Sequence, residues 1–234
     1  MAESFSVAML QPPVSTTLCE RCREYLDVTG VAISLMDGTD MSSICVADDR
    51  AARLDELQFT LGAGPSYDAF HFGQPVFDDE VNAPTSTRWP TLAEFALESG
   101  INGIFAFPLQ IGAARTGVLT AYQADVKSWT LTQHADALTA ADALTHVILS
   151  IQAKSRAGDL AGALWQTGTN RVEVHQASGM LSVQAGVSVA EALVLLRSHA
   201  YATTRPLASL ASDVIIHRVR IERSGSTDLS WRED

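Results

Sequence analysis

The sequence lacks the hydrophobic and cysteine patterns of membrane and secreted proteins. None of its apolar runs approaches the ~20 residues of a bilayer-spanning helix. Its start, MAESFSVAMLQPPVS, has neither the basic residues nor the long apolar stretch of a signal peptide. Three cysteines in 234 residues are an odd number and make no disulfide framework. These absences predict a cytoplasmic protein in a reducing compartment.

Residue groups that hold metals or carry out catalysis are also scarce. Cys19 and Cys22 have the Cys-x-x-Cys spacing of half a zinc or redox site, but no second pair follows. No glutamate or cysteine stands at metal-ligand spacing from His71, His134 or His146. The sequence therefore predicts structural cysteines and histidines, no metal site, no catalytic residues and no enzymatic activity.

Negative charge is unevenly distributed along the chain. The formal net charge is -11. Residues 1–155 hold 19 acidic and 8 basic side chains, whereas residues 160–222 hold 4 acidic and 5 basic ones. An acidic surface repels RNA, so charge permits nucleic-acid binding only in the second part. Hydrophobic residues make up 47% of the chain, which is enough for packed cores in both parts.

The first 155 residues show alternating helix and strand patterns. Turn-rich segments at 38–40 and 112–114 separate pairs of β-prone runs, which predicts two antiparallel hairpins. We expect strands within 31–38, 42–48 and 100–123, and helices over 15–30, 48–58 and 131–154. An antiparallel sheet with helices at both ends indicates an α+β domain in which helices cover one face of the sheet.

Two segments of this part carry family motifs. FTLGAGPSYDAFHFGQPVFDDE contains a Gly-x-Gly-Pro turn at Gly62, Gly64 and Pro65. RWPTLAEFALESGINGIFAFPLQIGAARTGVLTAYQ contains an Arg-Trp-Pro step and a Phe-Pro-Leu strand. Together they make residues 10–155 resemble the GAF domains of actinobacterial regulators. Glycine and proline matches report backbone geometry, so they bear on the fold more than on a ligand.

The GAF resemblance implies an input from a small molecule or a protein partner. It leaves the cofactor unknown, because the signature of cyclic-nucleotide binders and a cysteine placed for bilin attachment are both missing. Five aromatic residues are the candidates for lining a pocket over the sheet. The alternative is that they belong to the ordinary core. These residues are Phe70, Phe77, Trp89, Phe95 and Phe105.

The second part predicts a compact unit of three short helices. Ser188 and Glu191 form a capping-box pattern after the break at Gly186, and Pro206 suits the first turn of a third helix. Apolar residues recur at steps of three and four in all three segments. Small residues at Ala177 and Gly179 are expected to let the helices approach closely.

This unit resembles the ANTAR domain of transcription antitermination regulators. The resemblance spans residues 160–222 and lies in RVEVHQASGMLSVQAGVSVAEALVLLRSHA and TTRPLASLASDVI. It departs at Ser178, where the family commonly has a basic residue. The matching positions are Arg171, Ala177, Gly179, Gly186, Ala192, Leu196, Arg197, Ala200, Leu207 and Ala211.

The ANTAR resemblance implies binding to nascent RNA folded as two stem-loops, which favours an antiterminator over a terminator. Arginines directed at phosphates and a histidine or Tyr201 stacked on a base would supply the contacts. For each residue alone, a surface or packing role is the alternative. The candidate RNA-binding residues are Arg171, Ala177, Gly179, Arg197, His199 and Arg205.

The sequence thus predicts a sensor domain at 10–155, a connector at 156–162, an RNA-binding domain at 163–222 and a flexible tail at 223–234. A homodimer is expected, and an apolar stripe on the 131–154 helix either joins two copies or packs on its own sheet. The stripe contains Leu144, Val147, Ile148 and Ile151. The competing function is a dimeric scaffold whose sensor domain binds a protein and whose last helices serve dimerisation.

Overall fold

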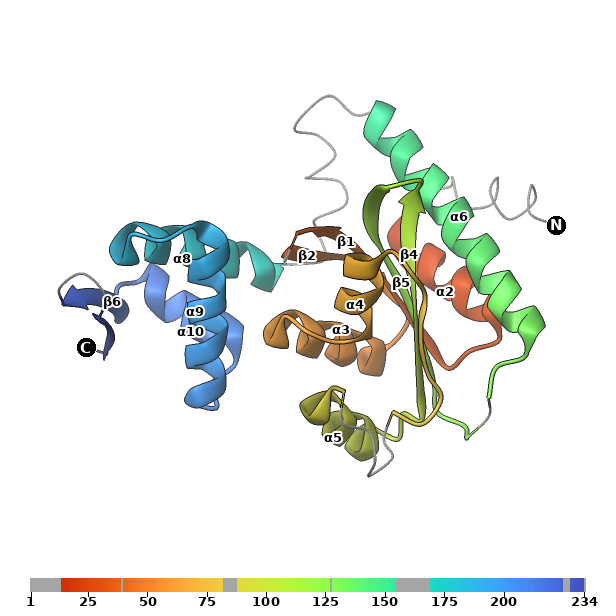
Figure 1. Cartoon of the computed structure of the whole chain (residues 1–234), viewed down its shortest axis with the longest axis horizontal. Helices are drawn as coiled ribbons and strands as arrows, with labels where there is room; N and C mark the ends of the chain where they lie inside the picture. The colour runs from red at the N-terminus through yellow and green to blue at the C-terminus, as the bar shows by residue number, and fades with distance from the viewer. Residues whose placement is uncertain are drawn as a thin grey trace. The chain divides into compact units, whose positions relative to one another are not determined.

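The structure, a computed structural model, describes residues 14–38, 40–81, 88–126, 128–154, 169–224 and 228–233. The chain divides into two compact units, Met1–Thr167 and Gly168–Asp234, each with its own secondary structure (Figure 1). The connector predicted at 156–162 lies outside the described residues.

The N-terminal unit contains a five-stranded antiparallel sheet with the strand order β2-β1-β5-β4-β3. Both predicted hairpins are confirmed, and Gly38 and Gly112 take left-handed φ values of 60° and 58° in their turns. The strands are β1 (Gly30–Asp37), β2 (Asp40–Val46), β3 (Val76–Asp78), β4 (Gly103–Ile111) and β5 (Ala114–Gln123). The helices are α2 (Val14–Leu26), α3 (Asp49–Leu61), α4 (Pro65–Phe72), α5 (Pro90–Ser99) and α6 (Leu131–Lys154).

Helices cover both faces of this sheet, so the expectation of a single covered face is wrong. Helices α2 and α6 contact one face, and α3 and α4 contact the other (Figure 1). The central strands explain the difference, because successive side chains of a strand point to opposite faces. In β4, Ile104 and Ala106 are as fully buried as Phe105 and Phe107. Such a continuous apolar run is typical of a strand buried on both sides.

The apolar stripe of α6 belongs to the core of its own unit. Leu144, Val147 and Ile148 are buried in one cluster with Phe105 of β4 and residues of α2. The alternative that the stripe packs on its own sheet is therefore confirmed for these three residues. The side chain of Ile151 lies outside the described part of the chain.

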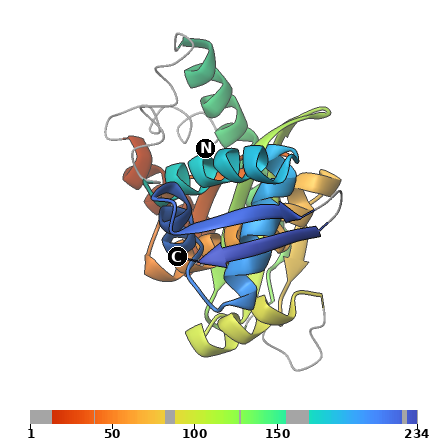
Figure 2. The ribbon, with the colours of Figure 1, turned by 90° about the vertical axis from the view of Figure 1, so that its left-hand side faces the viewer.

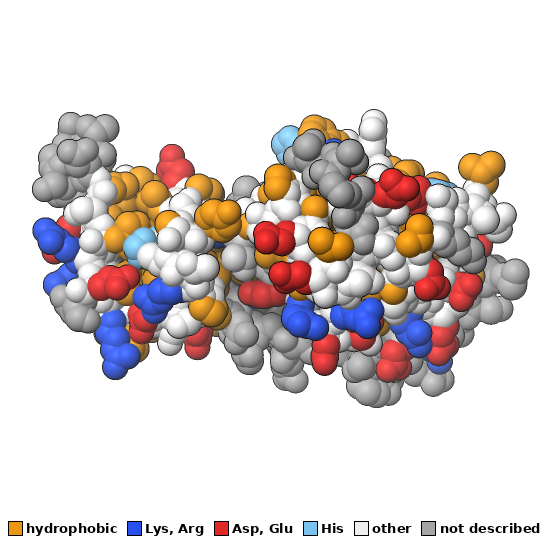
Figure 3. Space-filling model, turned by 90° about the horizontal axis from the view of Figure 1, so that it is seen from below, with side chains coloured by type: hydrophobic (Ala, Val, Ile, Leu, Met, Phe, Trp, Pro, Cys, Tyr) orange, Lys and Arg blue, Asp and Glu red, His pale blue; other side chains and the backbone are white. Residues whose placement is uncertain are grey.

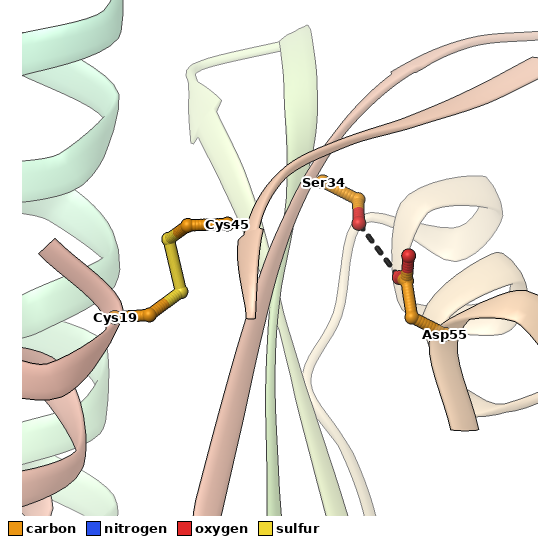
Figure 4. Close-up of a disulfide and its surroundings, with 4 residues drawn as sticks. All are labelled: Cys19, Ser34, Cys45 and Asp55. Atoms are coloured by element: carbon orange, nitrogen blue, oxygen red, sulfur yellow. Dashed lines mark hydrogen bonds between the residues drawn. A yellow bond between two sulfur atoms is a disulfide. The ribbon is translucent and has the colours of Figure 1, made fainter. Parts of the chain in front are cut away.

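A disulfide joins two of the three cysteines, which contradicts the expectation of unpaired thiols. Cys19 of α2 and Cys45 of β2 are bonded, with their Cα atoms 5.9 Å apart (Figure 4). Cys22 lies about one helical turn after Cys19, but the bond joins Cys19 to Cys45, which is remote in the sequence. Cys22 is free and buried, and its burial raises the pKa of the thiol to about 12. This thiol is therefore protonated and unreactive at neutral pH.

Reduction of the disulfide is expected to destabilise the N-terminal unit. The bond closes a loop with a sequence separation of 26 residues, for which the chain-entropy model gives about 3.5 kcal/mol. Thermal unfolding with and without a thiol reductant measures the loss. The Cys45→Ser variant is the control, since reductant should not lower its unfolding temperature further. An equal unfolding temperature for oxidised and reduced wild type would contradict the expectation.

The C-terminal unit contains the three predicted helices, α8 (Thr169–Ala185), α9 (Val189–Ala202) and α10 (Leu207–Ile215). The capping box at the start of α9 is confirmed. The Glu191 amide donates to Ser188 Oγ at 3.2 Å, and the Ser188 amide donates to Glu191 Oε2 at 2.8 Å. The core combines small and apolar side chains from all three helices. Its fully or nearly fully buried members include Val174, Ala177, Leu181, Ala192, Leu196, Ala200, Leu207, Leu210, Ala211 and Val214.

An antiparallel hairpin follows the three helices, where a flexible tail was expected. Its strands are β6 (Val219–Ser224) and β7 (Asp228–Glu233). Val219 and Ile221 are buried, and the Ile221 amide donates to Gln184 Oε1 of α8 at 3.0 Å. The hairpin lies against the helices of its unit (Figure 2). Strand β6 is therefore anchored in the unit through both packing and hydrogen bonding.

Within the described ranges, no single helix is long and apolar enough to cross a membrane. Residues Arg171–Ala185 and Val189–Ala202 satisfy the criteria of length and composition only as a pair, which is bent by 105°.

Candidate nucleic-acid interface

Two of the predicted RNA-binding arginines are buried. The side chains of Arg171 on α8 and Arg197 on α9 both belong to residues only 6% exposed. Buried arginines support helix packing through their long aliphatic stems and fixed charge. This burial indicates a packing role for both residues within the unit, while their direct contact with RNA stays a prediction.

The small residues of α8 have different environments. Ala177 is fully buried, which fits close helix packing. Ser178 is also fully buried, and its hydroxyl donates to the Val174 carbonyl at 2.8 Å. A Cβ built on Gly179 would meet no atom within 4 Å outside its own helix. Close approach between helices of the unit therefore does not require Gly179, which leaves part of the α8 surface open.

Replacing Gly179 by alanine is expected to stabilise the C-terminal unit. Glycine inside a helix costs about 0.5–1 kcal/mol relative to alanine, and here the added methyl group enters open space. Chemical denaturation followed by helical circular dichroism measures the gain. A loss of stability would show that the position is more crowded than the structure indicates.

His199 lies in a cluster formed with the C-terminal strand. The rings of His199 on α9 and Trp231 on β7 stack with centroids 4.0 Å apart and planes inclined by 10°. Glu233 Oε1 lies 3.4 Å from His199 Nε2 and 3.7 Å from Arg205 Nη1. We call His199, Arg205, Trp231 and Glu233 the His199 cluster. Its side chains are accessible in part, with His199 13% exposed and Arg205 27% exposed.

Cationic groups continue from this cluster to the end of α10. Arg205 is hydrogen-bonded to Asp213, and Arg218 Nη1 lies 3.8 Å from the same carboxylate. The Arg218 side chain is 70% exposed. Water screens the pair of Arg218, so a phosphate can compete for this arginine at little cost to the fold. The pair of Arg205 with Asp213 is partly buried, with side chains 27% and 21% exposed.

Trp231, Glu233 and Arg218 are absent from the sequence-predicted interface. The tryptophan was the available signal, because a large aromatic side chain near a chain end commonly docks on the fold. Tyr201 is 67% exposed, but it follows His199 by two residues and so lies on the other side of α9. The space-filling view shows basic, acidic and hydrophobic side chains interspersed on this unit (Figure 3).

The five aromatic residues predicted to line a ligand pocket do not share one site. Phe77 and Phe105 lie on the α6 side of the sheet, where Phe105 stacks on Trp129 at 4.0 Å and Phe77 contacts His134 edge-on. The other three belong to helices α4 and α5 or their ends, and α4 covers the opposite face. These three are Phe70, Trp89 and Phe95. The Arg88 guanidinium lies over the Trp89 ring at 4.6 Å.

Buried polar side chains instead gather between the sheet and helices α3 and α4. Ser34 Oγ of β1 donates to Asp55 Oδ1 at 2.7 Å (Figure 4). Gln58 Oε1 accepts from the Ser66 amide at 2.8 Å, and the Ser66 and Thr120 hydroxyls lie 2.7 Å apart. Gln58 is fully buried, and its Nε2 has no hydrogen-bond partner among the described residues. This polar group is therefore a candidate contact for a small polar ligand or a water.

Metal-ligating side chains are not grouped in the part of the chain that the structure describes. No three histidine, cysteine, aspartate or glutamate side chains there could hold a metal ion together. Cys19 and Cys22 likewise do not act as a pair, since Cys19 is bonded to Cys45.

The family comparison assigns the C-terminal helices. Residues 163–215 match the family model described as the ANTAR domain. The chain contains an ANTAR domain. The match covers α8, α9 and α10 and ends before the β6–β7 hairpin. The ANTAR domain is a regulatory domain rather than a catalytic one. The comparison with curated proteins found no match to the sequence.

Comparison with solved structures shows the fold of the N-terminal unit. The GAF domain of a phosphoenolpyruvate-protein phosphotransferase from Coxiella burnetii is 15% identical with a TM-score of 0.51, covering 65% of this chain and 93% of its own. The GAF domain of the Acinetobacter phosphotransferase is 10% identical with a TM-score of 0.48, covering 66% and 94%. The first of these likenesses establishes a GAF fold. The protein thus combines a unit with a GAF fold and an ANTAR domain, as the resemblances predicted.

Proposed function

We propose that this protein is a signal-responsive transcription antitermination regulator. Its ANTAR domain binds a nascent transcript folded as two stem-loops, and its GAF-fold unit controls that binding. The observation that supports this proposal best is the family match over α8 to α10. A cytoplasmic location would give such a protein access to nascent RNA.

Contacts to RNA fit the partly exposed end of the ANTAR domain. RNA loops are recognised by stacking of splayed bases on aromatic or guanidinium groups and by arginines at phosphates. His199 supplies an aromatic ring for stacking. Arg205 and Arg218 supply positive charges, and the contacts with Glu233 and Asp213 connect these groups. The open surface at Gly179 gives a nucleic-acid backbone room to approach α8. Arg171, Arg197 and Ala177 maintain the helices that position these groups.

A salt titration tests the phosphate contacts. Each phosphate neutralised on a single strand contributes about 0.7 to the slope of log affinity against log salt concentration. The Arg205→Gln, Arg218→Gln double variant is therefore expected to bind stem-loop RNA with a slope smaller by about 1.4. Arg50→Gln, Arg53→Gln on the exposed surface of the N-terminal unit is the charge-matched control. Equal slopes for the two double variants would exclude these contacts.

The input is proposed to act on the face of the sheet covered by α3 and α4. The support is the buried Gln58 side chain, whose Nε2 has no described hydrogen-bond partner. A small polar ligand there would satisfy this group and shift the packing of α3 and α4. The alternative input is a protein partner on the surface of the same unit. Hydrogen exchange of α3 and α4, measured with and without candidate metabolites, distinguishes a small-molecule input from a protein input.

A dimeric scaffold is the second candidate, and α8 supplies the observation that favours it. Val172 is 53% exposed and Val183 is 84% exposed, and with Gln176 and Gly179 they make an uncharged stripe at helical spacing. We propose that two copies associate through this stripe. Val183→Glu should reduce dimerisation in sedimentation equilibrium. Val126→Glu, which changes a side chain 81% exposed in the other unit, should leave it unchanged.

A further inference from the structure

Strand β7 presents a flat aromatic ring and a negative charge to α9, which are the two groups that a nucleotide would present. The flat indole of Trp231 lies parallel to the His199 ring, with centroids 4.0 Å apart. Nucleic-acid bases stack on aromatic side chains in the same manner. Two residues further on, the Glu233 carboxylate lies 3.4 Å from His199 and 3.7 Å from Arg205. An anion between a histidine and an arginine occupies the place that a phosphate would take.

We propose that β7 is an intramolecular competitor for the RNA site of the ANTAR domain. Trp231 takes the position of a loop base and Glu233 takes that of a phosphate, so RNA binds in full only after β7 leaves. This inference rests on the proposed RNA-binding function and specifies its site and its regulation. It places base stacking on His199 and phosphate binding on Arg205.

The two strands of the hairpin differ in how they are held. Strand β6 is fixed by buried Val219 and Ile221 and by the hydrogen bond from the Ile221 amide to Gln184. Strand β7 is held by the partly exposed His199 cluster and by its pairing with β6. An isolated two-stranded hairpin is only marginally stable in water. Strand β7 can therefore separate while β6 and the three helices stay in place.

The ion pairs of β7 favour such an exchange. The Glu233 side chain is 56% exposed, so water screens its attraction to the Arg205 guanidinium. An RNA phosphate brings the same charge together with a base for the same ring. In the exchange, an RNA base replaces Trp231 on the His199 ring and a phosphate replaces the Glu233 carboxylate. The remaining contacts of the stem-loops then determine whether the RNA-bound state or the β7-bound state is favoured.

The test compares full-length variants in binding to a tandem stem-loop RNA. Trp231→Ala, Glu233→Gln removes the competing ring and anion and is expected to tighten binding about three- to tenfold. Glu222→Gln is the matched control, because it neutralises a carboxylate on the same hairpin that pairs with Arg220 and Arg232. Its effect should stay within about twofold. Adding His199→Ala to the double variant should reverse the gain.

Hydrogen exchange of β7 gives a readout that does not depend on affinity. In wild type, saturating RNA should increase exchange at residues 228–233 while α8 to α10 become more protected. Tight wild-type binding with β7 still protected, and no gain in the double variant, would overturn the competitor while leaving RNA binding intact. Weaker binding by the double variant than by Glu222→Gln would also overturn it. Absence of binding even by the double variant would overturn the RNA-binding function as well.

Discussion

Replacing Gly64 by alanine is expected to lower the free energy of unfolding of the N-terminal unit by about 3–5 kcal/mol. Gly64 precedes α4 with φ 138° and ψ 177°, a backbone conformation that residues with a Cβ rarely adopt. Its Cβ would also lie 2.6 Å from Oε1 of Gln58. Gln58 cannot easily move away, because it is fully buried and its Oε1 accepts a hydrogen bond from the Ser66 amide.

Gly100→Ala is the matched control for this prediction. Gly100 also has a positive φ, 66°, but its Cβ would meet no atom within 4 Å. Its replacement should therefore lower the free energy of unfolding only by the strain of a residue with a Cβ at positive φ, which is about 1–2 kcal/mol. Denaturant unfolding of both variants, followed by tryptophan fluorescence, measures the two losses. Equal losses would show that Gln58 does not constrain Gly64.

Replacing Arg197 by alanine is expected to destabilise the ANTAR domain by about 2–4 kcal/mol. Arg197 is 6% exposed and lies on α9 beside Leu196 and Ala200, which are both buried. Truncation removes a long stem from a packed site and leaves a cavity. Arg218→Ala, at a side chain 70% exposed, should change stability by less than about 0.5 kcal/mol.

Hydrogen exchange of α8 to α10 separates this effect from RNA binding. Arg197→Ala should raise exchange throughout the three helices even without RNA, because the domain unfolds more often. Loss of RNA binding in this variant therefore reports the fold and not a phosphate contact. Unchanged exchange together with lost RNA binding would contradict the packing role and restore Arg197 as a contact residue.

Local patterns predicted most of the secondary structure. Hairpin turns at Gly38 and Gly112, the capping box of Ser188 and Glu191 and the periodic apolar residues of α8 to α10 depend on neighbours within a few residues. The GAF and ANTAR resemblances placed these elements in an N-terminal unit with a GAF fold and a C-terminal ANTAR domain. The coverage of the sheet on both faces was missed, although the continuous apolar run of β4 indicated it.

Contacts between distant residues could not be predicted in the same way. The odd number of cysteines predicted no disulfide, whereas folding brings Cys45 of β2 against Cys19 of α2. Alternation along the strands separates Phe77 and Phe105 from the aromatic residues of α4 and α5. These outcomes depend on which face of the sheet each helix covers, and no short segment contains that information.

The candidate RNA site shows the same limit. The family motif selected Arg171 and Arg197 by position, but helix packing buries both. His199 and Arg205 were also selected from the motif region, but their contacts with Trp231 and Glu233 involve a strand near the chain end. A charged, polar tail without apolar periodicity gave little reason to expect that strand.

The most direct test measures binding of the full chain to a tandem stem-loop RNA and to a control RNA with the same stems and scrambled loops. The account predicts loop-dependent binding by wild type and tighter loop-dependent binding by Trp231→Ala, Glu233→Gln. Adding His199→Ala should abolish the loop preference while the helical circular dichroism is retained. Equal affinity of the double variant for both RNAs, or no binding to either, would contradict recognition of RNA loops by this ANTAR domain.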